Sequence, residues 1–170
     1  VPAARADLDD GLARRQRQAL ETLAAIAGRE FFVFPLQLTG DYQIRHHSPF
    51  GSMHVAVDYV LESFARFAQA ETVLLVKEHP LDSGYTNWRA YLLAKAQRLG
   101  VAGRVYHIDG GELDDLSAAA KGMVCVNSTS ATLALEVGTP VSVLGDAIYD
   151  IKGITHSGGL DSFWARPTPP

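Results

Sequence analysis

The chain has 170 residues, of which 47% are hydrophobic and 20% are charged, so it is long and apolar enough to form one globular domain with a buried core. Its formal net charge of −4 argues against a nucleic-acid-binding protein, which normally carries a basic excess. The single cysteine, Cys125, excludes an internal disulfide framework and points to a reducing compartment, and no apolar run reaches the roughly 20 residues of a membrane span.

The predicted elements begin with a helix over residues 8–27, which Gly28 ends and whose apolar residues recur near a 3.6-residue period: Leu12, Ala19, Leu20, Leu23 and Ile26. FFVFPL (31–36) is a wholly apolar strand, in which Pro35 indicates a sheet edge or the end of the strand. Ser52 is the predicted cap of the next helix, whose apolar face carries Val57, Val60, Leu61, Phe64 and Phe67.

The rest of the chain continues the alternation of strands and helices. Strands are expected at 72–76, 104–108, 123–126 and 140–144, and helices at 85–99, 112–120 and 129–137, before an irregular tail from residue 145. Near-continuous apolar strands joined by helices are typical of a parallel sheet with helices on both faces. The sequence therefore predicts an α/β domain of this architecture.

Polar residues follow the end of every predicted strand. The carboxyl ends of parallel strands meet at one edge of the sheet, where ligands bind. We therefore expect the following residues, far apart in sequence, to meet in space: Gln37, Asp41, Lys77, Glu78, His79, His107, Asp109, Gly110, Gly111, Asn127, Ser128, Thr129, Ser130, Gly145 and Asp146.

Two of these segments suit phosphate, and each has a plainer interpretation. In VCVNSTSATLALEVGTP, residues 127–130 lead a strand into a helix, whose free N–H groups and neighbouring hydroxyls suit a phosphate; ordinary N-capping is the alternative. In KEHP, His79 can donate to a phosphate or protonate a leaving group, or it is a solvated turn histidine. Lys77 would add positive potential, and Pro80 would fix the direction of the chain.

Two carboxylates have equally open roles. Asp41, in QLTGD, is a candidate nucleophile or base, or an Asx-turn residue beside glycine. Glu136 can hydrogen-bond ribose hydroxyls or remain solvated. The P-loop, the G-x-G-x-x-G fingerprint and the G-x-S-x-G elbow are all missing from the sequence, and little supports a zinc site.

Four segments occur in one order between about Phe31 and Trp164: FPLQLTGDYQIRHHSPF, LLVKEHPLDSG, VNSTSATLALEVGTPV and LGDAIYDIKGITHSGGLDSFW. Together they resemble the capsular polysaccharide biosynthesis and export family, which includes the Kdo transferases that build the lipid-linked Kdo oligomer of bacterial capsules. The resemblance implies a GT-B glycosyltransferase that uses CMP-Kdo, without a cofactor or metal. Residues 1–170 would be its Rossmann-like C-terminal donor-binding domain. The acceptor domain would be absent, so the chain alone is expected to bind nucleotide weakly and to transfer nothing.

The resemblance also implies roles for individual residues. The family's His-Pro and Ser/Thr motifs, which engage the CMP phosphate, map onto His79-Pro80 and Ser128-Thr129. Asp41, in the family's Q-x-x-x-D stretch, is the implied nucleophile of a retaining reaction, and Gln37 would orient it. Ile108 and backbone groups of residues 109–111 would hold cytosine.

The implied partners are the nucleotide-sugar donor, a lipid-linked glycan acceptor bound through the missing domain, and other capsule assembly and export proteins, with no nucleic acid. The implied location is the cytoplasm, with peripheral attachment to the inner membrane face left open. Two other functions also stay open. One is a non-catalytic module of the capsule export machinery, and the other is a GT-B-like sugar-nucleotide epimerase with a uracil-type nucleotide site.

Overall fold

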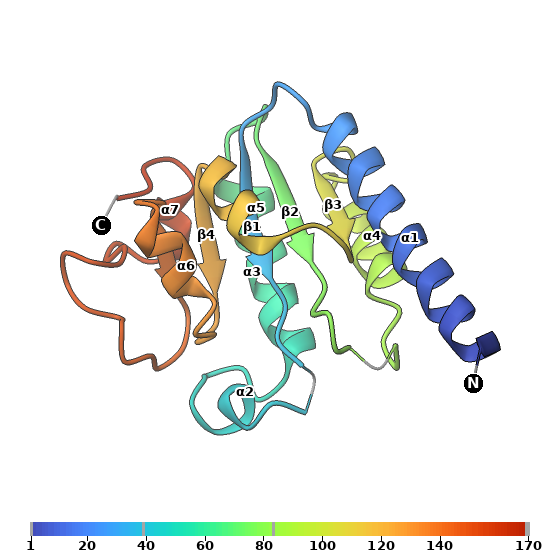
Figure 1. Ribbon diagram of the computed structural model, residues 1–170. Helices are drawn as coiled ribbons and strands as arrows, with labels where there is room; N and C mark the ends of the chain where they lie inside the picture. Colours follow the sequence, from blue (N-terminus) through green and yellow to red (C-terminus); the bar gives the residue numbers. More distant parts are fainter. Residues whose placement is uncertain (1, 39, 83, 169–170) are drawn as a thin grey trace.

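Five parallel strands form the centre of the molecule, in the order β3-β2-β1-β4-β5 (Figure 1). The computed structural model describes residues 2–38, 40–82 and 84–168, with side chains from residue 10 onward. The strands are β1 (Phe31–Pro35), β2 (Val73–Lys77), β3 (Val105–Ile108), β4 (Gly122–Cys125) and β5 (Val141–Val143). Because every strand pair is parallel, all five carboxyl ends lie at the same edge of the sheet.

Helices cover both faces of this sheet, as the sequence predicts. They are α1 (Pro2–Ala25), α2 (Tyr42–His46), α3 (Met53–Phe67), α4 (Trp88–Arg98), α5 (Leu113–Ala119), α6 (Ala131–Glu136) and α7 (Leu160–Phe163). Successive strand residues point to opposite faces, so Phe32 and Phe34 pack with α3, α4 and α7, while Val33 packs with α1, α5 and α6. No helix of the described part combines the length and apolar character needed to cross a bilayer.

The N-terminal helix α1 buries a narrower face than predicted. Ala19 and Ile26 are buried and Leu23 is partly buried, whereas Leu12 and Leu20 are 60% and 66% exposed. Leu20 lies about 100° round the helix from Ala19, which turns it away from the sheet. The helix packs along β3 (Figure 1), and Gln18 Nε2 donates to the carbonyl oxygen of His107 at 2.9 Å.

Helix starts are set by capping side chains. Ser52 is the N-cap of α3, as predicted, and accepts a hydrogen bond from the amide of Val55. Helix α4 begins at Trp88 rather than at residue 85, because Asn87 Oδ1 accepts from the amide of Ala90 and fixes the first turn there. At the other end of α3, Phe67 is 42% exposed, although the sequence places it on the buried face.

The tail beyond β5 is not irregular throughout, which corrects the sequence-based expectation. It contains α7, and both Phe163 and Trp164 at its end are fully buried against α3 and the sheet. Gly122 permits this packing, because a Cβ atom there would lie 2.6 Å from Cζ of Phe163. The end of the tail, at α7, is therefore part of the hydrophobic core.

The strand order places a topological switch point between β1 and β4. From β1 the chain winds outward through β2 to β3, then returns to β4 and winds outward to β5. The loops that leave β1 and β4 consequently diverge, and ligands of open parallel sheets bind in the crevice that this leaves at the carboxyl edge. The topology thus predicts a ligand site beside the residues that follow β1 and β4.

Candidate functional site

Two adjoining cavities lie at the carboxyl edge beside the switch point. The larger, named the strand-end cavity, has a volume of about 660 Å³ and lies among Lys77, His79, Pro80, Asp109, Gly110, Gly111, Ser128, Thr129 and Ser130, with apolar walls from Leu12, Leu36 and Leu133. The smaller, named the Asp41 cavity, has a volume of about 430 Å³ and is lined by Gln37, Asp41, Asn127, Asp146 and Tyr149 among others. His79, Ser128 and Thr129 line both cavities. The structure thus brings together most of the residues that the sequence singles out.

The side chain of His79 is oriented by its own turn. Its Nδ1 accepts a hydrogen bond from the amide of Leu81 at 3.1 Å. Neutral histidine carries one ring proton, so this acceptor role places the proton on Nε2. His79, which is half-buried and lines both cavities, therefore carries its ring N–H donor on Nε2.

Lys77 is a buried cation at the wall of the strand-end cavity. It is only 6% exposed, and its Nζ donates to the carbonyl oxygen of Gly110 at 3.1 Å. Burial lowers the pKa of Lys77, while the carboxylates of Glu112, Asp109 and Glu78 oppose that shift. The lysine joins the end of β2 to the loop after β3 and gives the cavity positive potential.

The Ser-Thr-Ser turn before α6 (residues 128–130) is stabilised by its own hydroxyl groups and by a tyrosine of the tail. Ser128 Oγ lies 2.6 Å from Ser130 Oγ and accepts from the amide of Ser130. The hydroxyl of Tyr149 donates to the backbone oxygen of Ser128 and lies 3.5 Å from Cys125 Sγ. Burial raises the pKa of Cys125 to about 12, so the thiol stays protonated and donates toward Tyr149. The role of Tyr149 was not predicted from the sequence. It lies in the tail, whose apolar and aromatic residues follow no helical or strand periodicity that would mark one of them as buried.

Gln37 and Asn127 tie the two sides of the switch point together. Gln37 Nε2 donates to Asn127 Oδ1 at 3.0 Å, and Gln37 Oε1 accepts from the Asn127 amide at 3.2 Å. Asn127 Nδ2 donates to the carbonyl oxygens of Gln43 and His47, both at 3.0 Å. These bonds use every polar atom of the Asn127 side chain, so it has no N–H donor left for a ligand. Its role is structural, because it connects the end of β4 to the segment that contains α2.

Asp41 is both a helix cap and a cavity residue. Its Oδ1 accepts from the Gln43 amide at 2.9 Å, which makes it the N-cap of α2, a helix that the sequence did not predict. Among the described residues, the hydrogen-bond contact of its Oδ2 is a long one, 3.4 Å to Gln37 Nε2. Oδ1 therefore fixes the orientation of the carboxylate through the cap, and Gln37 lies beside Oδ2 in the Asp41 cavity.

Other predicted residues occupy less direct positions. Glu136 is exposed at the last residue of α6 and is absent from the linings of these two cavities. Asp109 Oδ2 lies 3.7 Å from Arg15 Nε. Glu78 pairs with His107 at 2.6 Å, a contact that adjacent polar strand ends could have suggested. Among the described residues, no cluster of three or more His, Cys, Asp or Glu side chains could hold a metal ion.

The sequence of this chain matches a known protein family over nearly its whole length. Residues 5–170 match the family described as capsule polysaccharide biosynthesis protein. The chain belongs to the capsule polysaccharide biosynthesis protein family. It is 40% identical over 142 residues to the capsule polysaccharide modification protein LipB of Neisseria meningitidis, covering 83% of this chain and 34% of LipB. It is 33% identical over 155 residues to the capsule polysaccharide export protein KpsS of Escherichia coli, covering 91% of this chain and 40% of KpsS.

Solved structures share the fold of this family member. The beta Kdo 2,7 transferase of Thermosulfurimonas dismutans KpsC superposes with a TM-score of 0.54 at 21% identity, covering 85% of this chain and 45% of that one. Anabaena Alr3699/HepE in complex with UDP-glucose superposes with a TM-score of 0.53 at 15% identity, covering 86% and 40%. The predicted fold class and family resemblance are therefore confirmed. The chain spans about a third to two fifths of the curated relatives described above.

Proposed function

We propose that this chain is the donor-binding part of a capsular polysaccharide glycosyltransferase that moves Kdo from CMP-Kdo to a lipid-linked acceptor. The observation that carries the proposal is the strand-end cavity, where His79, Lys77 and the Ser128–Ser130 turn converge beside the switch point. A departing nucleotide phosphate needs hydrogen-bond donors and positive potential, which these groups supply. The acceptor would bind in the part of the protein beyond this chain, on the cytoplasmic side of the membrane with other capsule assembly and export proteins.

The proposed chemistry uses the two adjoining cavities in two steps. In the first step, Asp41 Oδ2 forms a bond to the anomeric carbon of Kdo while the bond from that carbon to the CMP phosphate oxygen breaks, and CMP leaves with His79 Nε2–H donating to its phosphate. In the second step, the acceptor hydroxyl oxygen forms a bond to the anomeric carbon while the bond from that carbon to Asp41 Oδ2 breaks, which frees the Asp41 carboxylate, and the hydroxyl proton passes to solvent water. Two inversions give net retention. The positions of Asp41 and His79 on the walls of the same cavity support this division of roles.

Replacement of His79 by alanine tests the nucleotide site. Calorimetric titration of the chain with CMP should show weak binding that falls by about tenfold or more in His79→Ala, because a charge-assisted hydrogen bond to phosphate is lost. His79→Gln, which retains an N–H donor, should recover part of the affinity. His46→Ala is the control, since His46 is exposed and lies outside the cavity linings.

The outcome also separates the other functions. UMP binding as tight as CMP binding would favour the epimerase, whose site takes a uracil nucleotide. CMP binding that is equal in the parent and in His79→Ala would contradict the placement of phosphate at His79. The full-length protein should repeat the pattern with higher affinity if the missing domain completes the site.

Replacement of Tyr149 by phenylalanine tests the support beneath the Ser-Thr-Ser turn. It removes the hydroxyl that donates to the Ser128 carbonyl while keeping the ring. We expect CMP affinity to fall about threefold to tenfold and the free energy of unfolding to fall by about 1 kcal/mol, the value of one hydrogen bond. Tyr85→Phe, at a side chain that is 97% exposed, should change neither quantity. Unchanged CMP affinity in Tyr149→Phe would show that the turn holds its shape without Tyr149.

A further inference from the structure

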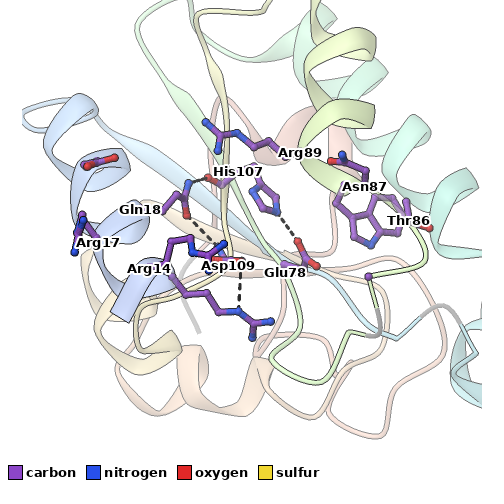
Figure 2. A pocket seen from close by; sticks show the side chains of 13 residues that line it. Arg14, Arg17, Gln18, Glu78, Thr86, Asn87, Arg89, His107 and Asp109 are labelled. Carbon is purple, nitrogen blue, oxygen red and sulfur yellow. Dashed lines mark hydrogen bonds and ion pairs between the residues drawn. The ribbon is translucent and has the colours of Figure 1, made fainter. Parts of the chain in front are cut away.

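A third cavity, named the arginine cavity, lies between α1, the first turn of α4 and the ends of β2 and β3 (Figure 2). Its volume is about 530 Å³. Arg15, Glu78 and Asp109 line both this cavity and the strand-end cavity, so the two adjoin across these side chains. None of the roles proposed above uses the arginine cavity.

The charge of the arginine cavity is mostly unpaired and positive. Arg14, Arg17 and Arg89 line it, and within the described side chains none of them lies within ion-pair distance of a carboxylate. Two of the lining carboxylates are already engaged: Glu78 with His107 at 2.6 Å, and Asp109 with Arg15 at 3.7 Å. The remaining carboxylate is that of exposed Glu21. The lining thus contains three guanidinium groups, from two helices, that have no ion-pair partner among the described side chains, and one carboxylate that is not already engaged.

The floor of the cavity is polar and incompletely satisfied. The side chain of His107 is only 10% exposed, and its Nε2 is engaged with Glu78. Its Nδ1 and the Oδ1 of Asp109 are buried without a hydrogen-bond partner among the described residues. Buried polar atoms of native proteins are normally paired with protein, water or ligand. The floor therefore has hydrogen-bonding capacity that the described part of the chain does not use.

The rest of the lining suits a sugar better than a nucleotide base. Asn87 uses Oδ1 to cap α4, its Nδ2 has no hydrogen-bond partner among the described residues, and Thr86 adds a hydroxyl. The aromatic lining residue, Trp88, is 1% exposed and directs its Nε1 to Asp82 at 3.3 Å, so it offers no face on which a base could stack. A volume of about 530 Å³ also exceeds what a single inorganic ion needs.

We propose that the arginine cavity binds an anionic sugar, with Arg14, Arg17 and Arg89 holding its carboxylate or phosphate and Asn87 and Thr86 contacting its hydroxyls. Guanidinium groups recognise both anions in a bidentate manner, which gives them geometric selectivity as well as attraction. The inference is independent of the nucleotide site, because it uses neither His79 nor the Ser128–Ser130 turn.

Titration of the chain followed by NMR tests the proposal with four probes at low salt. The carboxylated probe is a sialic acid trimer, the phosphorylated probe is glucose 6-phosphate, the neutral probe is maltotriose and the free ion is inorganic phosphate. At least one anionic sugar should bind with an affinity at least about tenfold higher than that of maltotriose or of inorganic phosphate. Only an anionic sugar has both a charged group for the arginines and hydroxyls for Asn87 and Thr86. The tighter of the two anionic sugars identifies the charged group.

Variants locate the binding. Arg14→Gln with Arg17→Gln should weaken the anionic sugar about tenfold or more, and Arg89→Gln should weaken it about threefold or more, while CMP binding stays unchanged. Arg98→Gln is the matched control, since it removes the same charge from the exposed last turn of α4. The proposal would be overturned if neither anionic sugar bound, or if maltotriose or inorganic phosphate bound as tightly as the anionic sugars. It would also be overturned if Arg98→Gln weakened binding of the anionic sugar as much as the cavity variants do.

Discussion

A full-length protein of this family with asparagine in place of Asp41 should lose glycosyl transfer by a factor on the order of 10³ or more, because asparagine cannot act as the nucleophile of a double displacement. Asparagine caps helices as well as aspartate does, so α2 should keep its start at residue 42. CMP binding should also persist, since Asp41 faces the sugar in the proposed site and not the phosphate. The measurements are transfer from CMP-Kdo and calorimetry with CMP.

The control for the capping role is Ser52→Ala. Ser52 caps α3 through its Oγ, as Asp41 caps α2 through Oδ1, and its loss should cost about 1 kcal/mol of stability without affecting transfer. Incubation with CMP-Kdo alone adds a second observable, because the parent protein should gain the mass of one Kdo residue (Kdo less one water) at Asp41 and the variant should not. If the transfer rate of Asp41→Asn were within about tenfold of the parent rate, Asp41 would be only the N-cap of α2 and not the nucleophile. Absence of transfer from both proteins would favour the non-catalytic export module.

The polar residues at the strand ends could be predicted from sequence because parallel topology alone brings them to one edge. Once the strands ending at Lys77 and Cys125 are assigned to one parallel sheet, His79 and Ser128 are expected at the same edge of it. The structure places both strands beside β1, so the two residues line one cavity. Their chemistry is also local, since a His-Pro turn and a hydroxyl-rich turn are visible in short segments. The prediction needed no knowledge of side-chain packing.

Features that depend on contacts between distant segments were not predictable in the same way. Helix α2 has five residues, too few for an apolar period, and only its cap at Asp41 marked it. The exposure of Leu12 follows from where α1 crosses β3, which its own periodicity does not define. The arginine cavity is lined by both Arg14 and Arg89, which are 75 positions apart in the sequence. Packing geometry sets each of these features.

The burial of Trp164, at the end of α7, also depends on contacts between segments that are distant in the sequence. Trp164 is fully buried, and its ring stands edge-on to Phe32 at 5.0 Å and to Phe64 at 5.3 Å between centroids. Its Nε1 donates to Ser63 Oγ at 2.8 Å, and Ser63 Oγ donates to Asp161 Oδ1 at 2.6 Å. The indole therefore joins α7, α3 and β1 through both apolar and polar contacts.

Trp164→Ala should lower the free energy of unfolding by about 3–5 kcal/mol, since it leaves a large cavity and removes a buried hydrogen bond. That loss is a large part of the roughly 5–15 kcal/mol that stabilises a typical domain. Trp164→Phe should cost less, because the ring still fills much of the site and only the Nε1 donor is lost. Urea unfolding followed by circular dichroism measures both, with Tyr85→Ala as a control at an exposed aromatic that should change stability by less than about 0.5 kcal/mol. A loss of less than about 1 kcal/mol in Trp164→Ala would mean that the tail is an appendage, and the strand-end site would then have to be formed without its support.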